Sequence, residues 1–386
     1  MPDLTTLRDD TPGTHQVMHF NNAGAALQPS AVLNAVTAHL HNEALWGGYE
    51  AAALASAPLD AVYRSIARLL NAHPQEIAVV ENATRAWDMA FYALPLQPGE
   101  VILTSSNEYV GNYIPYLQLQ RQRGIEIQVL ADDNNGQVSL SALAERLAQP
   151  GVALVSLPLL GTDGGPLQPV REIGALCRAA GVTFLLDACQ GVGQLPLDVR
   201  EIGCHILTAT SRKYLRGPRG MGFLYIEKGL CEQLEPPFLD LHAATLVGPA
   251  QFDIRSDARR FEAWECNVAA KLGLGAAVDY ALEVGVERIW ERIQQLAGYL
   301  RRELSGIAGV QGEDAAVCTS GIVTFTLDAC SPLRVKQVLA QASKPINVSV
   351  TRGRTGPERV RASVHAYNTE AEIDALVAAV RGITAV

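Results

Sequence analysis

Three residues near the middle of the chain have types and spacing suited to amine chemistry. Asp187 ends the apolar run FLLD, Gln190 follows three residues later, and Lys213 lies just past the next apolar run. A buried carboxylate is costly unless it meets a cation, and a protonated pyridine nitrogen is such a cation. A lysine amine can form a Schiff base with an aldehyde and can later act as a base. These residue types indicate a pyridine aldehyde held by Lys213 and kept protonated by Asp187, with Gln190 within reach of its ring oxygen.

Each of these residues also has a plainer interpretation. An aspartate after a strand is more often the N-cap of the next helix than a ligand. Lys213 has three arginines close to it in the sequence and can belong to a solvated basic turn. The order of Asp187, Gln190 and Lys213, and their positions behind successive apolar runs, favours the functional interpretation.

The elements around these residues alternate between strands and helices. From about residue 75 to 230, short apolar runs rich in β-branched residues are separated by amphipathic stretches. This alternation is typical of an α/β fold with a mostly parallel mixed sheet and helices on both faces, where ligands bind beyond the carboxyl ends of the strands. The predicted strands are 101–106, 125–130, 152–158, 182–188, 206–211 and 220–227, and the predicted helices between them include 110–123, 139–148 and 170–180.

The pattern changes after about residue 265 and predicts a smaller α+β domain. We expect a large domain at 17–268 and a small domain formed by 1–16 together with 269–386. In the second part of the small domain, we predict helices at 269–284, 286–304 and 333–341, a strand at 321–327, short strands around Val348 and Ala362, and a last helix from Thr369.

The composition indicates a soluble metabolic protein. The chain has 386 residues, of which 48% are hydrophobic, and a net charge of −9, which argues against non-specific binding to nucleic acid. No apolar run reaches the roughly 18 residues of a membrane helix, and the N-terminal segment does not resemble a secretion signal. The seven cysteines are scattered without a CxxC pair, so we expect neither disulfides nor a metal site. We expect a cytoplasmic location.

Several motifs resemble those of the class V aminotransferase family. This family contains enzymes of fold type I that depend on pyridoxal 5'-phosphate (PLP), including cysteine desulfurases, isopenicillin N epimerase and several C–S lyases. The resemblance runs from about Phe20 to the end of the chain and implies that fold and that cofactor. It rests on DACQ at 187–190, TSRK at 210–213 and VRASVHAYNTEAEID at 360–374, with support from HFNNAGAALQP at 19–29 and RFEAWECN at 260–267.

The resemblance implies roles for residues around the cofactor ring. Lys213 would carry PLP and act as the base, Asp187 would pair with the pyridine nitrogen, and Gln190 with the ring oxygen. Tyr109 falls where the family stacks an aromatic ring, usually histidine, on the pyridine face. Stacking survives that exchange, so we count Tyr109 with Lys213 and Asp187 as the candidate catalytic residues.

The resemblance also implies binding sites for two anionic groups. Arg361 aligns with the arginine that binds the α-carboxylate of the substrate, which suits the planar guanidinium, although it can also be a surface arginine on an edge strand. Near the start of the chain, Asn22 and Ala23 are the other candidate substrate-binding residues. The candidate phosphate-binding residues are Thr84 and Arg85, at the start of an expected helix, together with Thr210 and Arg212.

Two departures from the family argue against a desulfurase that works through a persulfide. Cysteine desulfurases carry a nucleophilic cysteine on the loop before the carboxylate arginine, but residues 347–363 contain no cysteine. Pro158 stands where desulfurases usually carry an asparagine that orients the substrate. Arg352 and Arg354 on the loop can bind a second anionic group of the substrate or can be solvated.

We therefore expect a PLP enzyme that acts on a small amino acid, with a C–S lyase-type β-elimination as the leading hypothesis. The alternatives are a racemase or epimerase, for which Tyr109 and Cys266 are the candidate second acids, an aminotransferase, and a non-catalytic PLP-fold binding protein. The intact trio of Asp187, Gln190 and Lys213 argues against the last of these. By resemblance, we expect a homodimer with its site near the subunit interface, where Trp264 and Glu265 stand at positions that reach the partner's phosphate in relatives.

Overall fold

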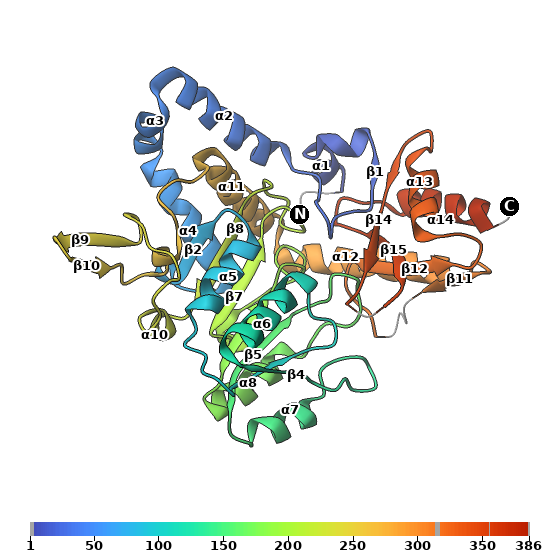
Figure 1. Ribbon diagram of the computed structural model, residues 1–386. Helices are drawn as coiled ribbons and strands as arrows, with labels where there is room; N and C mark the ends of the chain where they lie inside the picture. Colours follow the sequence, from blue (N-terminus) through green and yellow to red (C-terminus); the bar gives the residue numbers. More distant parts are fainter. Residues whose placement is uncertain (1–3, 313–316, 355, 385–386) are drawn as a thin grey trace.

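The computed structural model describes residues 4–312, 317–354 and 356–384. Its central element is a seven-stranded sheet in the order β2-β8-β7-β6-β5-β3-β4 (Figure 1). The pairs from β7 through β6, β5 and β3 to β4 are parallel, whereas β8 is antiparallel to both β7 and β2. The prediction of a mostly parallel mixed sheet is therefore confirmed. The strands are β2 (Ile77–Val80), β3 (Val101–Thr104), β4 (Glu126–Val129), β5 (Val152–Pro158), β6 (Thr183–Asp187), β7 (Ile206–Thr210) and β8 (Gly222–Ile226).

Helices cover both faces of this sheet because successive strand residues point to opposite sides. On one face, Leu154, Leu185 and Ile206 pack in a cluster with α5 (Ala83–Ala93) and α6 (Val110–Arg123). On the other face, Phe184 and Leu186 join the cluster that contains α4 (Ser56–Leu70), α8 (Val170–Ala180) and α11 (Val268–Val284). Burial on both faces explains why these strands are continuous apolar runs in the sequence.

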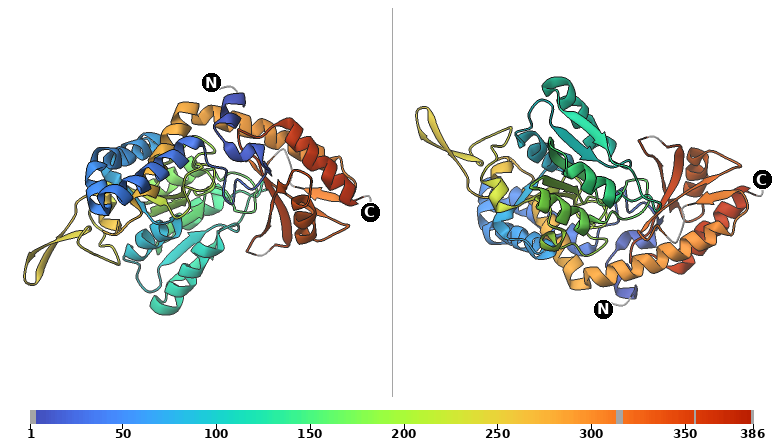
Figure 2. Two further views of the ribbon diagram at one scale, coloured as in Figure 1. Left: turned by 90° about the horizontal axis from the view of Figure 1, so that it is seen from above. Right: turned by 90° about the horizontal axis from the view of Figure 1, so that it is seen from below.

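The C-terminal part of the chain forms a second sheet of four antiparallel strands in the order β11-β12-β15-β14. The long helix α12 (Val286–Ser305) runs from the central sheet towards this sheet, as both views of Figure 2 show. The predicted helices and strands of this part are confirmed, with ends that differ by one or two residues. The remaining elements are β11 (Val310–Gly312), β12 (Ile322–Leu327), α13 (Pro332–Ala340), β13 (Ile346–Asn347), β14 (Ser349–Arg352), β15 (Glu358–Ser363) and α14 (Glu370–Thr384).

The start of the chain packs against this C-terminal part. Strand β1 (Met18–His19) pairs in parallel with β13, and Asn21 forms a bridge with Ser363. The Arg8 guanidinium donates hydrogen bonds to the Tyr367 carbonyl (2.9 Å) and the Glu372 carboxylate (3.0 Å). The segment from residue 4 to residue 21 therefore lies beside the C-terminal part, although most of the chain separates the two in sequence. Two short helical elements begin the chain, α1 (Leu4–Asp9) and a 3-10 turn at Pro12–His15.

Several elements were not predicted from the sequence. Helices α2 (Ser30–Trp46) and α3 (Gly48–Leu54) project beyond the central sheet, as does the hairpin of β9 (Ala244–Gly248) and β10 (Gln251–Ile254) (Figure 1). These elements bury few side chains within the chain, so their sequences lack a clear apolar period. None of the helices in the described part of the chain is long and apolar enough to cross a membrane. The short elements left are α7 (Leu140–Leu147), α9 (Val199–Ile202), α10 (Lys228–Cys231) and 3-10 turns at Pro74–Glu76 and Ala258–Phe261.

Candidate active site

A cavity lies at the carboxyl ends of the central strands. Strands β5, β6 and β7 end at Pro158, Asp187 and Thr210, and all three residues line this cavity. The parallel register places Pro158 opposite Asp187 and Asp187 opposite Thr208, so the strand ends lie side by side. The cavity is lined by Asn82, Ala83, Thr84, Tyr109, Asn112, Pro158, Leu160, Thr162, Asp187, Cys189, Gln190, Thr210, Arg212 and Lys213. The fold thus brings together Thr84, Tyr109, Asp187, Gln190, Thr210, Arg212 and Lys213 from the predicted set.

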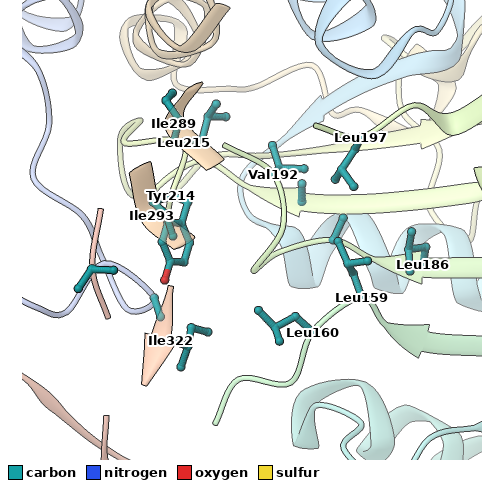
Figure 3. Packing of buried hydrophobic residues seen from close by; sticks show 14 of the residues in the cluster. Leu159, Leu160, Leu186, Val192, Leu197, Tyr214, Leu215, Ile289, Ile293 and Ile322 are labelled. Atoms are coloured by element: carbon teal, nitrogen blue, oxygen red, sulfur yellow. The ribbon is translucent and has the colours of Figure 1, made fainter. Parts of the chain in front are cut away.

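The loop that carries Lys213 is fixed by an apolar anchor. The next two residues, Tyr214 and Leu215, are buried in a cluster with Ile293 of α12 and Ile322 of β12 (Figure 3). The Tyr214 ring also stacks on His365, whose Nε2 lies 2.9 Å from the Tyr214 carbonyl oxygen. Because the residues after it are immobilised, the Lys213 amine has a defined place in the cavity.

The start of the chain holds the same loop from another side. The Ala26 amide donates a hydrogen bond to the Arg212 carbonyl (2.9 Å), and the Arg216 guanidinium donates to the Leu27 carbonyl (2.9 Å). The Leu27 amide in turn donates to the Tyr367 hydroxyl (3.3 Å). The lysine loop is therefore clasped between the N-terminal segment and residues that follow β15.

The electrostatic surroundings of Lys213 favour its neutral, nucleophilic form. Burial lowers the pKa of the Lys213 amine, and the neighbouring Arg212 and Arg361 guanidiniums lower it further, against opposing effects of Cys189 and Asp187. A neutral amine is the form that attacks an aldehyde and accepts a proton. This shift suits a lysine that forms a covalent bond with a cofactor aldehyde.

Asp187 is a buried carboxylate with one side turned to the cavity. Its Oδ1 accepts a hydrogen bond from the Cys189 amide and its Oδ2 accepts one from Asn112 Nδ2, both at 2.9 Å. The side chain is 8% exposed, and among the described residues none forms a salt bridge with it. A buried charge without an ion-pair partner is costly, so a cationic ring nitrogen placed against Asp187 would stabilise the site.

Gln190 offers a second sign that a polar group belongs in this cavity. Its Nε2 donates to the Ala23 carbonyl (3.3 Å) and to Thr162 Oγ1 (3.2 Å), and the residue is 3% exposed. The buried Oε1 has no hydrogen-bond partner within the described part of the chain. An unpaired buried polar atom costs about 1–3 kcal/mol, which a polar ring substituent bound here would relieve.

The opposite end of the cavity suits an anion. Helix α5 begins at Ala83, and its N-cap Asn82 accepts a hydrogen bond from the Arg85 amide (2.8 Å), while the backbone at Ala83 and Thr84 faces the cavity. Amides at a helix N-terminus bind phosphate because of their direction and the helix dipole. Thr210 and Arg212 line the same cavity and are joined by a hydrogen bond of 2.9 Å.

Gly222 allows the close approach that this anion site requires. A Cβ atom at residue 222 would lie 2.6 Å from the Ala83 amide nitrogen, so a side chain on β8 would displace the start of α5. The residues of the cavity therefore fit PLP. Thr84, Thr210 and Arg212 are suited to its phosphate, Asp187 and Gln190 to its ring, and Lys213 to its aldehyde.

Four predicted residues, Arg85, Asn22, Ala23 and Arg361, are not part of the cavity lining. The Arg85 guanidinium lies over the Phe238 ring, 4.9 Å from its centroid, so only the backbone amide of this residue contributes to the helix start. Asn22 is fully buried, and its side chain is occupied by the Ser363 carbonyl (2.7 Å) and the Tyr367 hydroxyl. Ala23 contacts the site only through its carbonyl, which accepts from Gln190.

Arg361 lies behind the cavity and is joined to it by one residue. Its Nη1 donates to the Thr162 carbonyl (2.6 Å) and Oγ1 (3.2 Å), and its Nε donates to Ser349 Oγ (3.0 Å). Burial lowers the pKa of the Arg361 guanidinium. Thr162 lines the cavity, so the Arg361 side chain is within one residue of the site. By contrast, Cys266 lines a different hollow with Tyr49, Trp264 and Glu265.

Sequence reasoning missed three polar residues of the cavity, Asn82, Asn112 and Thr162. Asn112 stands in the first turn of α6, three residues after Tyr109, and Thr162 lies on the loop after β5. The motif NEYVGN contains Asn112 but gives no sign that this helix turn faces Asp187. Thr162 lacks any local pattern because its role depends on Arg361, which is about 200 residues away in sequence.

Known proteins are similar to this chain over nearly its whole length. The family model described as aminotransferase class-V matches residues 18–376. A probable cysteine desulfurase of Xylella fastidiosa (strain 9a5c) is 30% identical over 98% of this chain and 95% of its own length. A probable hercynylcysteine sulfoxide lyase of Mycobacterium tuberculosis (strain CDC 1551 / Oshkosh) is 29% identical over 95% of this chain and 90% of its own.

A solved structure extends the similarity to three dimensions. The complex of the cystine C–S lyase C-DES with its reaction product cysteine persulfide has a TM-score of 0.87 and 25% identity, covering 95% of this chain and 98% of that one. The names of these relatives denote cleavage of carbon–sulfur bonds, which agrees with the C–S lyase hypothesis. The fold is therefore PLP fold type I, the cofactor is PLP, and the chain belongs to the aminotransferase class-V family.

Proposed function

We propose that the protein is a PLP-dependent C–S lyase that cleaves an S-substituted cysteine by β-elimination. The observation that carries this proposal is the chemistry of the cysteines near the site. The loop 347–363 contains none, and Cys189 is the cysteine found in the cavity lining. Burial raises the pKa of the Cys189 thiol well above its usual value, and the Asp187 charge raises it further. A thiol in that state is a poor nucleophile for transfer of sulfur to the enzyme.

The residues of the cavity divide the reaction between them. PLP supplies an electron sink that acidifies the Cα proton of a bound amino acid. Lys213 would hold the cofactor aldehyde in the resting enzyme and, as a free neutral amine, would accept the Cα proton. Asp187 holds the ring-nitrogen proton, and Arg361 with Thr162 orients the substrate carboxylate. The Cβ–S bond would break with loss of the Cα proton, and the sulfur would leave with its substituent and take up a proton. The released unsaturated amine would then react with one water to give pyruvate and ammonia.

A hollow beside the cavity supports a substrate larger than cysteine. It shares Tyr109 and Thr162 with the cavity and is also lined by Arg352 and Arg354. The Arg354 guanidinium lies over the Tyr113 ring, 4.4 Å from its centroid, which holds the charge at the rim of this hollow. Glu108, Asp132 and Asp163 line the same hollow, so a polar substituent on the substrate sulfur that can meet both guanidiniums and carboxylates fits this surface.

Product analysis tests the proposed reaction. Purified enzyme is incubated with L-cysteine, cysteine conjugates and cysteine S-oxides, with D-amino acids included to detect inversion. We expect pyruvate and ammonia in equal amounts, with the best kcat/KM for a conjugate or S-oxide. Because no thiol accepts the sulfur, we expect little alanine. Stoichiometric alanine together with a persulfidated enzyme cysteine would overturn the proposal, and optical inversion without pyruvate would replace it with epimerisation.

Replacement of Arg361 tests the carboxylate site. We expect Arg361→Ala to weaken binding of the transition state by several kcal/mol, which is seen as a lower kcat/KM. This is the order expected for losing one partner of a buried charge pair. The PLP content should stay near normal, because the arginine does not line the cofactor cavity itself. Arg359→Ala, two residues earlier on β15, is the matched control and should keep its activity. Unchanged kcat/KM in Arg361→Ala would show that the carboxylate binds elsewhere.

The same proposal includes a cytoplasmic homodimer with its site near the subunit interface. Support comes from large apolar side chains that are exposed in the single chain, including Trp46 (64%), Tyr49 (75%), Leu54 (74%) and Leu246 (73%). They lie on α2, α3 and the β9–β10 hairpin, which project from the central sheet (Figure 1). Burying them against a second copy removes apolar surface from water. The division into domains at 17–268 and at 1–16 with 269–386 belongs to the proposal as well.

A further inference from the structure

A second buried carboxylate lies directly behind Asp187. Glu108, at the start of α6, is 2% exposed and accepts hydrogen bonds at both oxygens. Its Oε1 accepts from the Tyr109 amide (2.8 Å) and from Asn112 Nδ2 (3.0 Å). Its Oε2 accepts from the Thr104 hydroxyl (2.9 Å) and the Tyr116 hydroxyl (3.0 Å). Four donors around one carboxyl group are the arrangement that suits the ionised form.

Asn112 joins this carboxylate to Asp187. The two hydrogens of its amide nitrogen point in different directions, one to Glu108 Oε1 (3.0 Å) and the other to Asp187 Oδ2 (2.9 Å). The bridge leaves Asp187 no freedom to rotate away from the cavity without losing a buried hydrogen bond. Asn112 itself lines the cavity, so the bridge ends where the cofactor ring belongs.

The charges of the two carboxylates are linked. Burial and, to a smaller extent, the Asp187 charge together raise the pKa of Glu108 to about 7, against three side-chain hydrogen bonds that lower it. The titratable side chains placed against Glu108 in the described chain are Asp187 on β6 and Tyr116 on α6. A pair of buried carboxylates with no cation between them gains most from a cation that binds at the cavity side.

We propose that Glu108 is a positioning residue that acts through Asn112: it holds the Asp187 carboxylate and adds a second negative charge that keeps the ring nitrogen of PLP protonated. The proposal rests on the assignment of Asp187 to that nitrogen. At an effective dielectric constant of about 20, a unit negative charge one residue behind Asp187 raises the pKa of the ring nitrogen by on the order of one unit. Glu108 thus acts on the electron sink through Asn112 and Asp187.

The variant Glu108→Gln removes the charge and keeps the shape. The amide oxygen can accept from Tyr109 and Asn112, and the amide nitrogen can face the Thr104 and Tyr116 hydroxyls, which are able to act as acceptors. The matched control is Glu76→Gln, because Glu76 is equally buried (3% exposed) but pairs with Arg200, away from the cavity lining. Loss of a buried carboxylate is common to both variants, whereas proximity to the cofactor is not.

The measurement is the ¹⁵N chemical shift of the ring nitrogen in holoenzyme loaded with ¹⁵N-labelled PLP, followed from pH 6 to pH 9. In Glu76→Gln, we expect the same protonation curve as in wild type, because Glu76 lies away from the cavity lining. In Glu108→Gln, the nitrogen should lose its proton at a pH lower by on the order of one unit. Exchange of the substrate Cα–H in heavy water should slow about tenfold in kcat, with KM little changed.

Asp187→Asn is measured beside these variants. It distinguishes a wrong role for Glu108 from a wrong assignment of Asp187 to the ring nitrogen. If Asp187→Asn deprotonates the nitrogen and Glu108→Gln behaves as wild type, Glu108 has no role in the electron sink and the inference is wrong. If Asp187→Asn leaves the nitrogen protonated, the assignment of Asp187 is wrong and the inference falls with it. Neither result depends on which bond the enzyme cleaves, so product analysis tests the lyase proposal independently.

Discussion

Replacing Lys213 by alanine is expected to abolish turnover and the covalent attachment of PLP. On the proposed assignment, the amine attaches the cofactor and removes the Cα proton, and no other lysine lines the cavity among the described residues. A positioned general base alone is worth about 10²–10⁴ in rate, so we expect kcat to fall by at least this factor. Turnover is measured by pyruvate release, and PLP content by absorbance after dialysis.

Peptide mapping identifies the lysine directly. The wild-type holoenzyme is expected to be yellow, and borohydride reduction followed by proteolysis should place the pyridoxyl group on the peptide that contains Lys213. Lys228→Ala is a suitable control, because Lys228 lies on α10 and is well exposed. A pyridoxyl group on a different lysine, or full activity of Lys213→Ala, would refute the assignment.

Asp187→Asn is expected to leave PLP bound while strongly slowing Cα deprotonation. The asparagine keeps the hydrogen bond from the Cys189 amide but carries no charge, so the ring nitrogen loses its counter-charge and the ring becomes a poorer electron sink. We expect the rate of Cα–H exchange in heavy water to fall by about 10²-fold or more, corresponding to roughly 3 kcal/mol of barrier. The exchange rate is followed by proton NMR of a slow substrate.

An aspartate outside the cavity provides the control for this variant. Asp198 caps α9 with hydrogen bonds to the Arg200 and Glu201 amides, and Asp198→Asn retains a good N-cap residue. Its exchange rate should equal that of wild type. Wild-type exchange in Asp187→Asn would show that Cα deprotonation does not depend on this carboxylate.

The central sheet could be predicted because its strands are buried on both faces. Strand β5 was predicted at 152–158 and has those bounds, and β6 was predicted at 182–188 and spans Thr183–Asp187. Such strands are continuous apolar runs, and their ends mark where polar residues become useful. Asp187 and Lys213 could therefore be identified as partners before their positions in space were known.

Residues whose roles depend on distant contacts could not be predicted. Glu108 and Asn112 occupy ordinary positions at a helix start, and only the packing of α6 against β6 gives them a buried partner in Asp187. Arg85 was expected at the phosphate because it follows Thr84 in the motif, but its side chain lies over the Phe238 ring. The sequence indicates the helix start, whereas the direction of a side chain depends on elements far along the chain.

The clasp around the Lys213 loop has a consequence for synthesis of the protein. The loop is held by Ala26 and Leu27 on one side and by His365 and Tyr367 on the other, so it lacks half of its supports while the ribosome is still making the chain. The ribosome adds about 5–20 residues per second, so residue 365 is made on the order of ten seconds after Lys213. The site for PLP is therefore complete only after residues 365 and 367 have been made, and a chain that stops before residue 365 would lack the contacts that these residues supply.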